Sequence, residues 1–484
     1  MRRIGPALAI RDFRLWWLAW LGMGIGLNMV EVAIGWEVYA QHRSALDLGW
    51  IGLAEFVPML ALALPAGHLA DRISRRLVFG AALAVAAGVG VGLALITGAG
   101  VRSVLPYLAL AVAAGVATAL ATPAARAMPP TLVPTSMVQG AMTLRSVAGQ
   151  GSQVLGPALG GLLYGVSAEL VYLLSAGFCL AAMACALSIS RRAPDAPPAP
   201  GAMPSAAPGP GWAPTSGEAP GRCWAAASGA ELGPPGSLAA GGARSPEADM
   251  GPPDVEGVLD GLRFVRRTPM LLGAILLDLM AVLFGGAVAL LPIYARSILR
   301  VGASGLGILR AAPAVGALLA AAALTRRPIG GRAGRLLLTV VGLYGVSIIV
   351  FGLSRSFELS LGALAVSGFV DLYSVNIRST TVALVSPDRL RGRVNAIEMV
   401  FISASNELGA FESGLAASLV GTVPAVVGGG AVTIALALGW GRLFPSLARM
   451  DRLDALRPAQ EAAGALRAAP ASGGVGATAG PNST

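Results

Sequence analysis

Long apolar segments separated by short polar connections dominate the chain. A helix needs roughly 20 apolar residues to cross the ~30 Å hydrocarbon core of a bilayer, and about twelve windows of this kind occur. They lie near 16–37, 50–70, 78–97, 103–122, 140–163, 169–189, 270–294, 304–324, 334–354, 357–380, 394–418 and 422–444. The pattern predicts an all-α integral membrane protein with twelve transmembrane helices.

The apolar pattern is interrupted once in the middle and stops before the end of the chain. Residues 191–258 and 448–484 are rich in Pro, Gly, Ala and Ser, a composition that cannot bury a core. We therefore expect both to be disordered and cytoplasmic, as a linker and a tail. The linker separates a six-helix bundle over 1–190 from a second six-helix bundle over 259–447.

The two halves resemble each other in sequence. "RAMPPTLVP" from Arg126 matches "RSTTVALVS" from Arg378, and "LGPALGGL" from Leu155 matches "LGAFESGL" from Leu408. At the second offset, Arg145 and Glu398 are equivalent positions with opposite charges. Two matches in the same order predict a pair of pseudo-symmetric bundles, an architecture typical of secondary transporters.

Composition strengthens the membrane assignment and excludes several chemistries. The chain is 55% hydrophobic and only 12% charged, against about 25% charged in soluble domains. All 35 basic residues are arginine, which excludes a Walker lysine and a Schiff-base lysine. We expect no cofactor, and any uphill transport should use the proton gradient rather than ATP. Three cysteines and two histidines are too dispersed to predict a disulfide framework or a metal site.

The net charge of +10 has a distribution that predicts topology. In the odd-numbered connections we place Arg43, Arg102, Arg296, Arg300 and Arg355, whereas most other arginines lie in the termini and the even-numbered connections. The positive-inside rule then puts both termini in the cytoplasm. We expect a multi-pass protein of the inner (cytoplasmic) membrane, with lipid and not nucleic acid as the partner of this charge.

Two motifs carry a resemblance to a known family. "GHLADRISRR" resembles the loop 2–3 signature of the major facilitator superfamily, with Gly67, Asp71, Arg72, Arg75 and Arg76 in place. Ser74 stands where that signature usually has glycine. "GPALGG", with Gly156, Pro157, Gly160 and Gly161, resembles the helix 5 motif of the superfamily's exporters.

Further stretches narrow the resemblance. "GWEVY", "LLPIYAR", "SNELGAFESG" and "LRGRVNAIE" are similar to the branch that includes the enterobactin exporter. The resemblance covers about 1–190 and 259–447. It implies the major facilitator fold, a secondary active transporter, and a central cavity lined by helices 1, 4, 7 and 10.

The charged loop is implied to act as a gating latch. Asp71 would face the N-terminal end of helix 11 near Arg393, and Arg72, Arg75 and Arg76 would bridge neighbouring helix ends. The alternative is an ordinary positively charged cytoplasmic loop. The "GPALGG" glycines equally suit simple close packing of helix 5.

Polar residues at bilayer depth are candidates for a transport site. A charged group is costly there, so its presence indicates a function. The candidates for the cavity are Asn28, Glu31, Asp278, Asp371, Arg378, Glu407 and Glu412. A carboxylate in a dry cavity can exchange a proton near neutral pH. We favour Glu31 and Asp371 as proton or cation sites, with Arg378 as the partner of Asp371. Satisfied interhelical pairs are the alternative, and Glu37 and Glu55 are interpreted as snorkelling to the outer face.

These observations favour a monomeric, proton-coupled exporter of a small amphipathic molecule that is drug-like, siderophore-like or a metabolite. An importer or facilitator of the same fold is one alternative, and a membrane sensor or scaffold is another. A membrane enzyme is disfavoured, because no Ser/His/Asp or metal-ligand constellation is present.

Overall fold

The computed structural model describes residues 6–190, 255–327 and 329–451, and these residues form helices and no strands. The linker predicted over 191–258 lies outside this part of the chain, apart from its last four residues. The predicted tail likewise lies outside it beyond Asp451.

The first half contains one long helix for each predicted window. The bounds are α1 (Pro6–Ala9), α2 (Arg11–His42), α3 (Ala45–Arg72), α4 (Arg75–Gly98), α5 (Val104–Arg126), α6 (Pro129–Leu132), η1 (Thr135–Met137), α7 (Val138–Tyr164) and α8 (Ala168–Leu187). The connections between the long helices are short, and two of these helices begin at a serine N-cap. Ser103 and Ser167 accept from the first-turn N–H groups of α5 and α8, respectively.

The second half repeats this order of long helices, with α9 before α10 and three short helical segments after it. The bounds are α9 (Val255–Arg267), α10 (Pro269–Gly285), η3 (Ala287–Leu290), α11 (Leu291–Ile293), η4 (Tyr294–Ile298), α12 (Gly302–Arg326), α13 (Ala333–Leu353), α14 (Phe357–Val385), α15 (Asp388–Val420), α16 (Thr422–Leu443) and α17 (Pro445–Ala448). Helix α9 was not predicted, and it includes residues 255–258, which we had placed in the linker. It packs against α15.

The chain after α17 docks on the start of α13. The N–H groups of Ala333 and Gly334 donate to the carbonyls of Asp451 and Met450 at 2.8 and 2.9 Å. Residues 448–451 are therefore part of the folded second half rather than of the tail.

Within the described residues, ten helices are long and apolar enough to cross a membrane. Helices α7 and α15 are longer than most, at 27 and 33 residues, but they are not in that set. Each packs against a helix of the other half, α7 on α12 and α15 on α3. Packing between the halves thus covers part of each of these less apolar helices.

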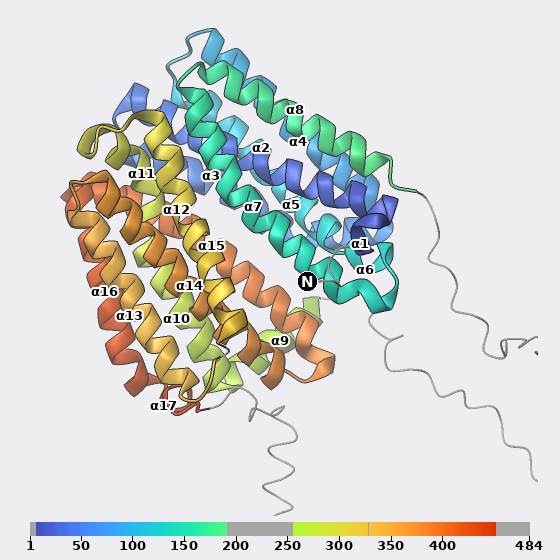
Figure 1. The fold of residues 1–484 in the computed structure, drawn as a ribbon, viewed down its shortest axis with the longest axis vertical. Coiled ribbons are helices and arrows are strands. Elements are labelled where there is room, and N and C mark those ends of the chain that lie inside the picture. The colour runs from blue at the N-terminus through green and yellow to red at the C-terminus, as the bar shows by residue number, and fades with distance from the viewer. Residues whose placement is uncertain (1–5, 191–254, 328, 452–484) are drawn as a thin grey trace, which may run out of the picture. The chain divides into compact units, whose positions relative to one another are not determined.

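The six long helices of each half pack in the same pattern (Figure 1). In the first half the closely packed pairs are α2–α7, α2–α8, α3–α5, α4–α5 and α4–α8. In the second half they are α10–α15, α10–α16, α12–α14, α13–α14 and α13–α16, which are the same pairs in chain order. The predicted fold class, two pseudo-symmetric six-helix bundles, is confirmed.

The halves pack closely at the end that carries the odd-numbered connections, which we call the loop end. These connections are 43–44, 99–103, 165–167, 299–301, 354–356 and 421. A Cβ atom at Gly161 of α7 would lie only 2.7 Å from the Gly307 Cα atom of α12. One at Gly414 of α15 would lie 2.7 Å from the Ala45 carbonyl oxygen of α3. Glycine is therefore required for this backbone-to-backbone contact.

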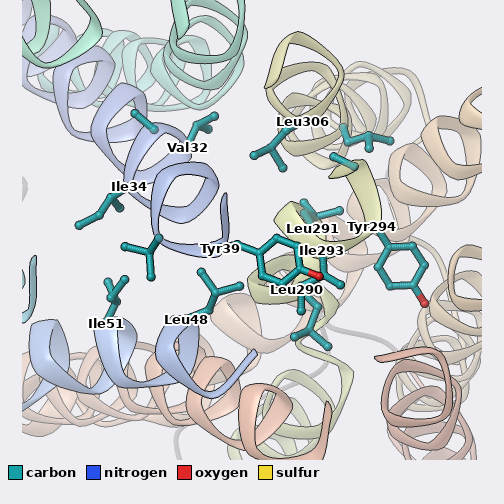
Figure 2. Packing of buried hydrophobic residues seen from close by; sticks show 14 of the residues in the cluster. Val32, Ile34, Tyr39, Leu48, Ile51, Leu290, Leu291, Ile293, Tyr294 and Leu306 are labelled. Carbon is teal, nitrogen blue, oxygen red and sulfur yellow. The ribbon is translucent and has the colours of Figure 1, made fainter. Parts of the chain in front are cut away.

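A hydrophobic cluster spans both halves at the loop end. Figure 2 shows its labelled side chains, Val32, Ile34, Tyr39, Leu48 and Ile51 of the first half and Leu290, Leu291, Ile293, Tyr294 and Leu306 of the second. Polar contacts accompany it, since the Tyr39 hydroxyl lies 2.9 Å from the Ser297 Oγ atom. The Arg296 guanidinium also lies over the Trp36 ring, 5.3 Å from its centroid.

The seventh transmembrane segment is broken, which the apolar pattern did not predict. Helix α10 ends at Gly285, and a 3₁₀ turn, a short helix and a π turn follow. The Tyr344 hydroxyl donates to the Gly285 carbonyl at 3.1 Å, and the Ser413 hydroxyl donates to the Gly286 carbonyl at 3.3 Å. Side chains from α13 and α15 therefore satisfy the backbone groups that the break frees.

Candidate functional site

A cavity of about 620 Å³ lies between the two halves. Every long helix except α16 contributes lining residues, and so does the broken segment after α10, through Gly286, Val288, Ala289 and Pro292. Discontinuous helices near the bilayer midplane commonly border transport sites. Most of the lining is apolar, and a few polar side chains are positioned within it.

Four carboxylates and one arginine line this cavity. They are Glu31 of α2, Glu55 of α3, Arg310 of α12, Asp371 of α14 and Glu407 of α15. If all ionise, the four acids outnumber the single base by three charges. Of the residues predicted for the cavity, the structure places Asn28, Glu31, Asp371 and Glu407 in the lining, and it adds Glu55 and Arg310.

An ion pair between Glu31 and Arg310 joins the two halves. The Arg310 side chain is only 15% exposed, whereas that of Glu31 is 51% exposed and faces the cavity. Glu407 also lies within electrostatic range of Arg310. The one arginine in the lining is therefore paired with a carboxylate of the opposite half and lies near a second carboxylate from its own half.

Glu55 and Glu407 face each other across the α3–α15 contact. The Glu407 Oε2 atom lies 3.4 Å from the position of a Cβ atom built on Gly52, one helical turn before Glu55. Neither carboxylate has a hydrogen-bond or ion-pair partner among the side chains that the structure describes. The interpretation of Glu55 as a residue snorkelling to the outer face is wrong, because α3 turns it into the cavity.

Asp371 lies beside Tyr344 at the same cavity wall. Within the described part of the chain it has no ion-pair or hydrogen-bond partner. The predicted pairing of Asp371 with Arg378 is wrong. Arg378 lies nearly two turns further along α14 and binds other acids.

Arg378 instead forms a buried triad inside the second half. It pairs with Asp278 of α10, and its Nε atom donates to the Glu398 Oε1 atom of α15 at 3.0 Å. The arginine side chain is 3% exposed, and each acid is 10% exposed. Asp278 and Arg378 therefore lie outside the central cavity and tie three helices of one half together.

Glu37 and Glu412 also differ in placement from the cavity acids. Glu37 does not snorkel: it is 4% exposed and accepts hydrogen bonds from Thr97, Tyr107 and Tyr172 at 2.6 to 3.1 Å. Glu412 is half-buried on α15 and is not part of the cavity lining.

The charged loop lies at the opposite end of the bundles, which we call the terminus end because residues 6, 190, 255 and 451 lie there. Arg75 donates to the Ala127 carbonyl at 3.1 Å and Arg76 to the Ile189 carbonyl at 2.8 Å. Both arginines thus hold helix ends of their own half.

The remaining residues assigned to the latch are only partly visible. The side chains of Asp71 and Arg72 lie outside those that the structure describes, as do the immediate surroundings of Gly67. Arg393 packs against α9, with its Cβ atom 3.2 Å from the position of a Cβ atom at Gly261.

The helix 5 motif is packed between both halves. Gly156 and Gly160 contact Asn28 and Met29 of α2, while Gly161 contacts α12. Pro157 lines the cavity. The motif therefore lets α7 approach two helices at once, one in each half.

Comparison with known proteins shows the family to which the chain belongs. The sequence profile of the Major Facilitator Superfamily matches residues 16–410. The chain belongs to the Major Facilitator Superfamily. No curated protein sequence matches it.

Solved structures of superfamily transporters share its fold. A D323A mutant of the nucleoside transporter NupG is 13% identical, with a TM-score of 0.61 over 90% of this chain and 100% of that one. A bacterial homologue of the human lysosomal transporter Spinster, in an inward-facing and occupied conformation, is 14% identical, with a TM-score of 0.62 over 90% and 96%. The human organic anion transporter MFSD10 is 16% identical, with a TM-score of 0.55 over 89% and 99%. At these identities the likeness concerns the fold alone.

Proposed function

We propose that this superfamily member is a proton-coupled exporter of a small amphipathic molecule and works by alternating access. The observation that carries the proposal is the set of three carboxylates in the cavity, Glu55, Asp371 and Glu407, that lack a partner in the described part of the chain. A structural role would leave such groups paired. A role in proton binding leaves them open to water and substrate.

Glu55 and Glu407 form the centre of the proposed coupling site. They come from opposite halves, so two negative charges facing each other oppose closure of the α3–α15 contact. One bound proton removes this repulsion. Protonation at this pair therefore favours one conformation of the two halves, which is the requirement for coupling.

The Glu31–Arg310 pair has the complementary role. It joins the halves across the cavity and must break or exchange partners when they separate. Glu407 is the neighbouring acid that can form an ion pair with Arg310 in place of Glu31. Release of Glu31 and recruitment of Glu407 would couple the conformational change to the charge state of the site.

The cavity supports a substrate of mixed character. About 620 Å³ is within the range of sites for drug-sized molecules, and the lining combines apolar walls with Asn28, Gln153, Asn406 and the acids. The exporter direction rests on the resemblance of the helix 5 motif. We propose an inner-membrane location with the terminus end in the cytoplasm, as the arginine distribution predicts.

The test is transport of a compound panel in inverted membrane vesicles, with and without an imposed pH gradient. Accumulation that requires an acidic lumen supports proton-coupled export. Accumulation that is independent of the gradient, or uptake in right-side-out vesicles only, contradicts it.

A further inference from the structure

Two arginines near the terminus end of the first half have no acid partner among the described side chains, unlike their counterparts in the second half. By the sequence repeat, Arg126 corresponds to Arg378 and Arg145 to Glu398. In the second half these positions form an ion pair, completed by Asp278. In the first half both positions carry a positive charge.

The backbone holds these two arginines near each other. Two adjacent tryptophans of α2 bind the residues that precede the two arginines. The Trp16 indole donates to the carbonyl of Ala125 at 3.0 Å, and the Trp17 indole donates to the carbonyl of Leu144 at 2.9 Å. The end of α5 and the first turns of α7 are therefore fixed side by side on one helix. The charges of the two guanidinium groups act on each other across this gap.

The described contacts of the two arginines do not compensate their charge. The Arg126 Nη1 atom lies 3.1 Å from the Met399 Sδ atom of α15, and a thioether is a weak acceptor. Among the described side chains, no acid pairs with Arg126 or Arg145. Both are partly buried, so water compensates them less than it does an exposed arginine.

We propose that Arg126 and Arg145 form a binding site for an anionic phosphate or carboxylate group. The planar guanidinium donates two parallel hydrogen bonds to such groups, and two of them can enclose one anion. Met399 belongs to the other half, so the anion would sit where the halves meet. The group can come from a lipid headgroup or from a soluble anion.

The test is thermal unfolding of the purified full-length chain in a neutral detergent. Inorganic phosphate is titrated against chloride at matched ionic strength, and phosphatidylglycerol against phosphatidylcholine. We expect phosphate, phosphatidylglycerol or both to raise the melting temperature. A response to the lipid alone assigns the headgroup as the source, and a response to phosphate assigns a soluble anion.

Three variants test whether Arg126 and Arg145 cause the stabilisation by the anion. Arg145→Glu recreates the pair of the second half, and Arg126→Gln removes one charge. Each should weaken the anion affinity about tenfold or more. Arg145→Glu without anion should unfold at the wild-type temperature or above, because its new charge is compensated. Arg335→Gln, an exposed arginine at the same end, should respond like the wild type.

Several outcomes would overturn the site. These are a wild type that neither anion stabilises beyond its control, an Arg145→Glu variant with unchanged affinity, and an Arg335→Gln variant with an equal loss. If Arg145→Glu does not fold, Arg145→Gln replaces it with the same expectation for affinity. Because the readout is binding, it does not depend on whether the chain exports a substrate by proton coupling.

Discussion

At the scale of single residues, the cavity acids differ in whether they have a partner. Glu31 is paired with Arg310, whereas Glu55 and Glu407 have no ion-pair or hydrogen-bond partner in the part of the chain that the structure describes. An unpaired carboxylate retains the freedom to bind a proton or a ligand. We therefore propose that the Glu55–Glu407 pair couples transport to protons and that the Glu31–Arg310 pair joins the two halves.

The coupling residues are tested by removing charge while keeping shape. Glu55→Gln and Glu407→Gln should each reduce pH-driven accumulation about tenfold or more, since the amide cannot release a proton. Substrate exchange at equal pH should persist. Glu412→Gln, on α15 but outside the cavity lining, is the matched control and should transport normally. Gradient-driven accumulation by both cavity variants at the wild-type rate would remove this pair from the mechanism.

The inter-half ion pair is tested by charge exchange. Arg310→Glu places an additional acid in an already acidic cavity and should abolish transport. Combining it with Glu31→Arg restores a pair between α2 and α12 and should recover a measurable fraction of the activity. The coupling energy from the double-mutant cycle measures the interaction. Strictly additive losses in the cycle would show that the contact has no functional role.

The buried triad should matter for stability instead. Arg378→Gln leaves Asp278 and Glu398 buried without their partner, and breaking a buried pair in this way destabilises proteins by about 3–5 kcal/mol. The loss is measured by denaturant unfolding in detergent. Arg335→Gln, at an exposed position, should change stability little. A triad variant as stable as the wild type would show that the acids are neutral in the folded protein.

At the scale of elements, glycine contacts control how closely the halves meet at the loop end. Gly161→Val would push a side chain into the Gly307 backbone of α12, since even its Cβ atom would lie 2.7 Å from the Gly307 Cα atom. We expect this variant to populate a conformation that is open at the loop end. Gly177→Val is the control, because nothing lies within 4 Å of a Cβ atom there.

The opening is measured by cysteine labelling. In a background without the native cysteines, Ala289→Cys places a thiol in the cavity wall. A membrane-impermeant maleimide added at the loop-end side should label it faster in Gly161→Val than in Gly177→Val. Equal labelling rates would show that the α7–α12 contact does not close the cavity.

The sequence predicted the long helices well. The thickness of the bilayer sets the length of each apolar run, and such a run can be recognised from consecutive residues alone. It did not predict the break after α10, because Gly285 and Gly286 are stabilised by Tyr344 and Ser413, which lie far away in the sequence. Helix α9 was missed because it is amphipathic and not uniformly apolar.

Site residues were predictable only in part for the same reason. Polar stripes on single helices pointed to Glu31 and Asp371, which do line the cavity. Glu55 was missed because its depth was judged from its position along the chain. The partner of Arg378 was wrongly assigned from neighbours on its own helix, whereas Asp278 and Glu398 come from α10 and α15. The ion-pair partner of a buried charged residue depends on how helices that are distant in the sequence pack together.

At the scale of the whole molecule, two similar bundles enclose one cavity but differ in charge. The second half neutralises its buried arginine internally, and the first half presents Arg126 and Arg145 without acids among the described residues. The cavity between them is acidic. The two halves therefore share a fold but differ in how their buried arginines are neutralised among the described residues.

The most direct test of this account measures substrate and proton fluxes together. The full-length chain is reconstituted in liposomes that contain a pH-sensitive dye, and a compound found in the vesicle panel is added without an imposed gradient. The account predicts that protons move in the direction opposite to the substrate, and that Glu55→Gln with Glu407→Gln abolishes this proton movement. Substrate flux without any accompanying proton flux in the wild-type protein would contradict it.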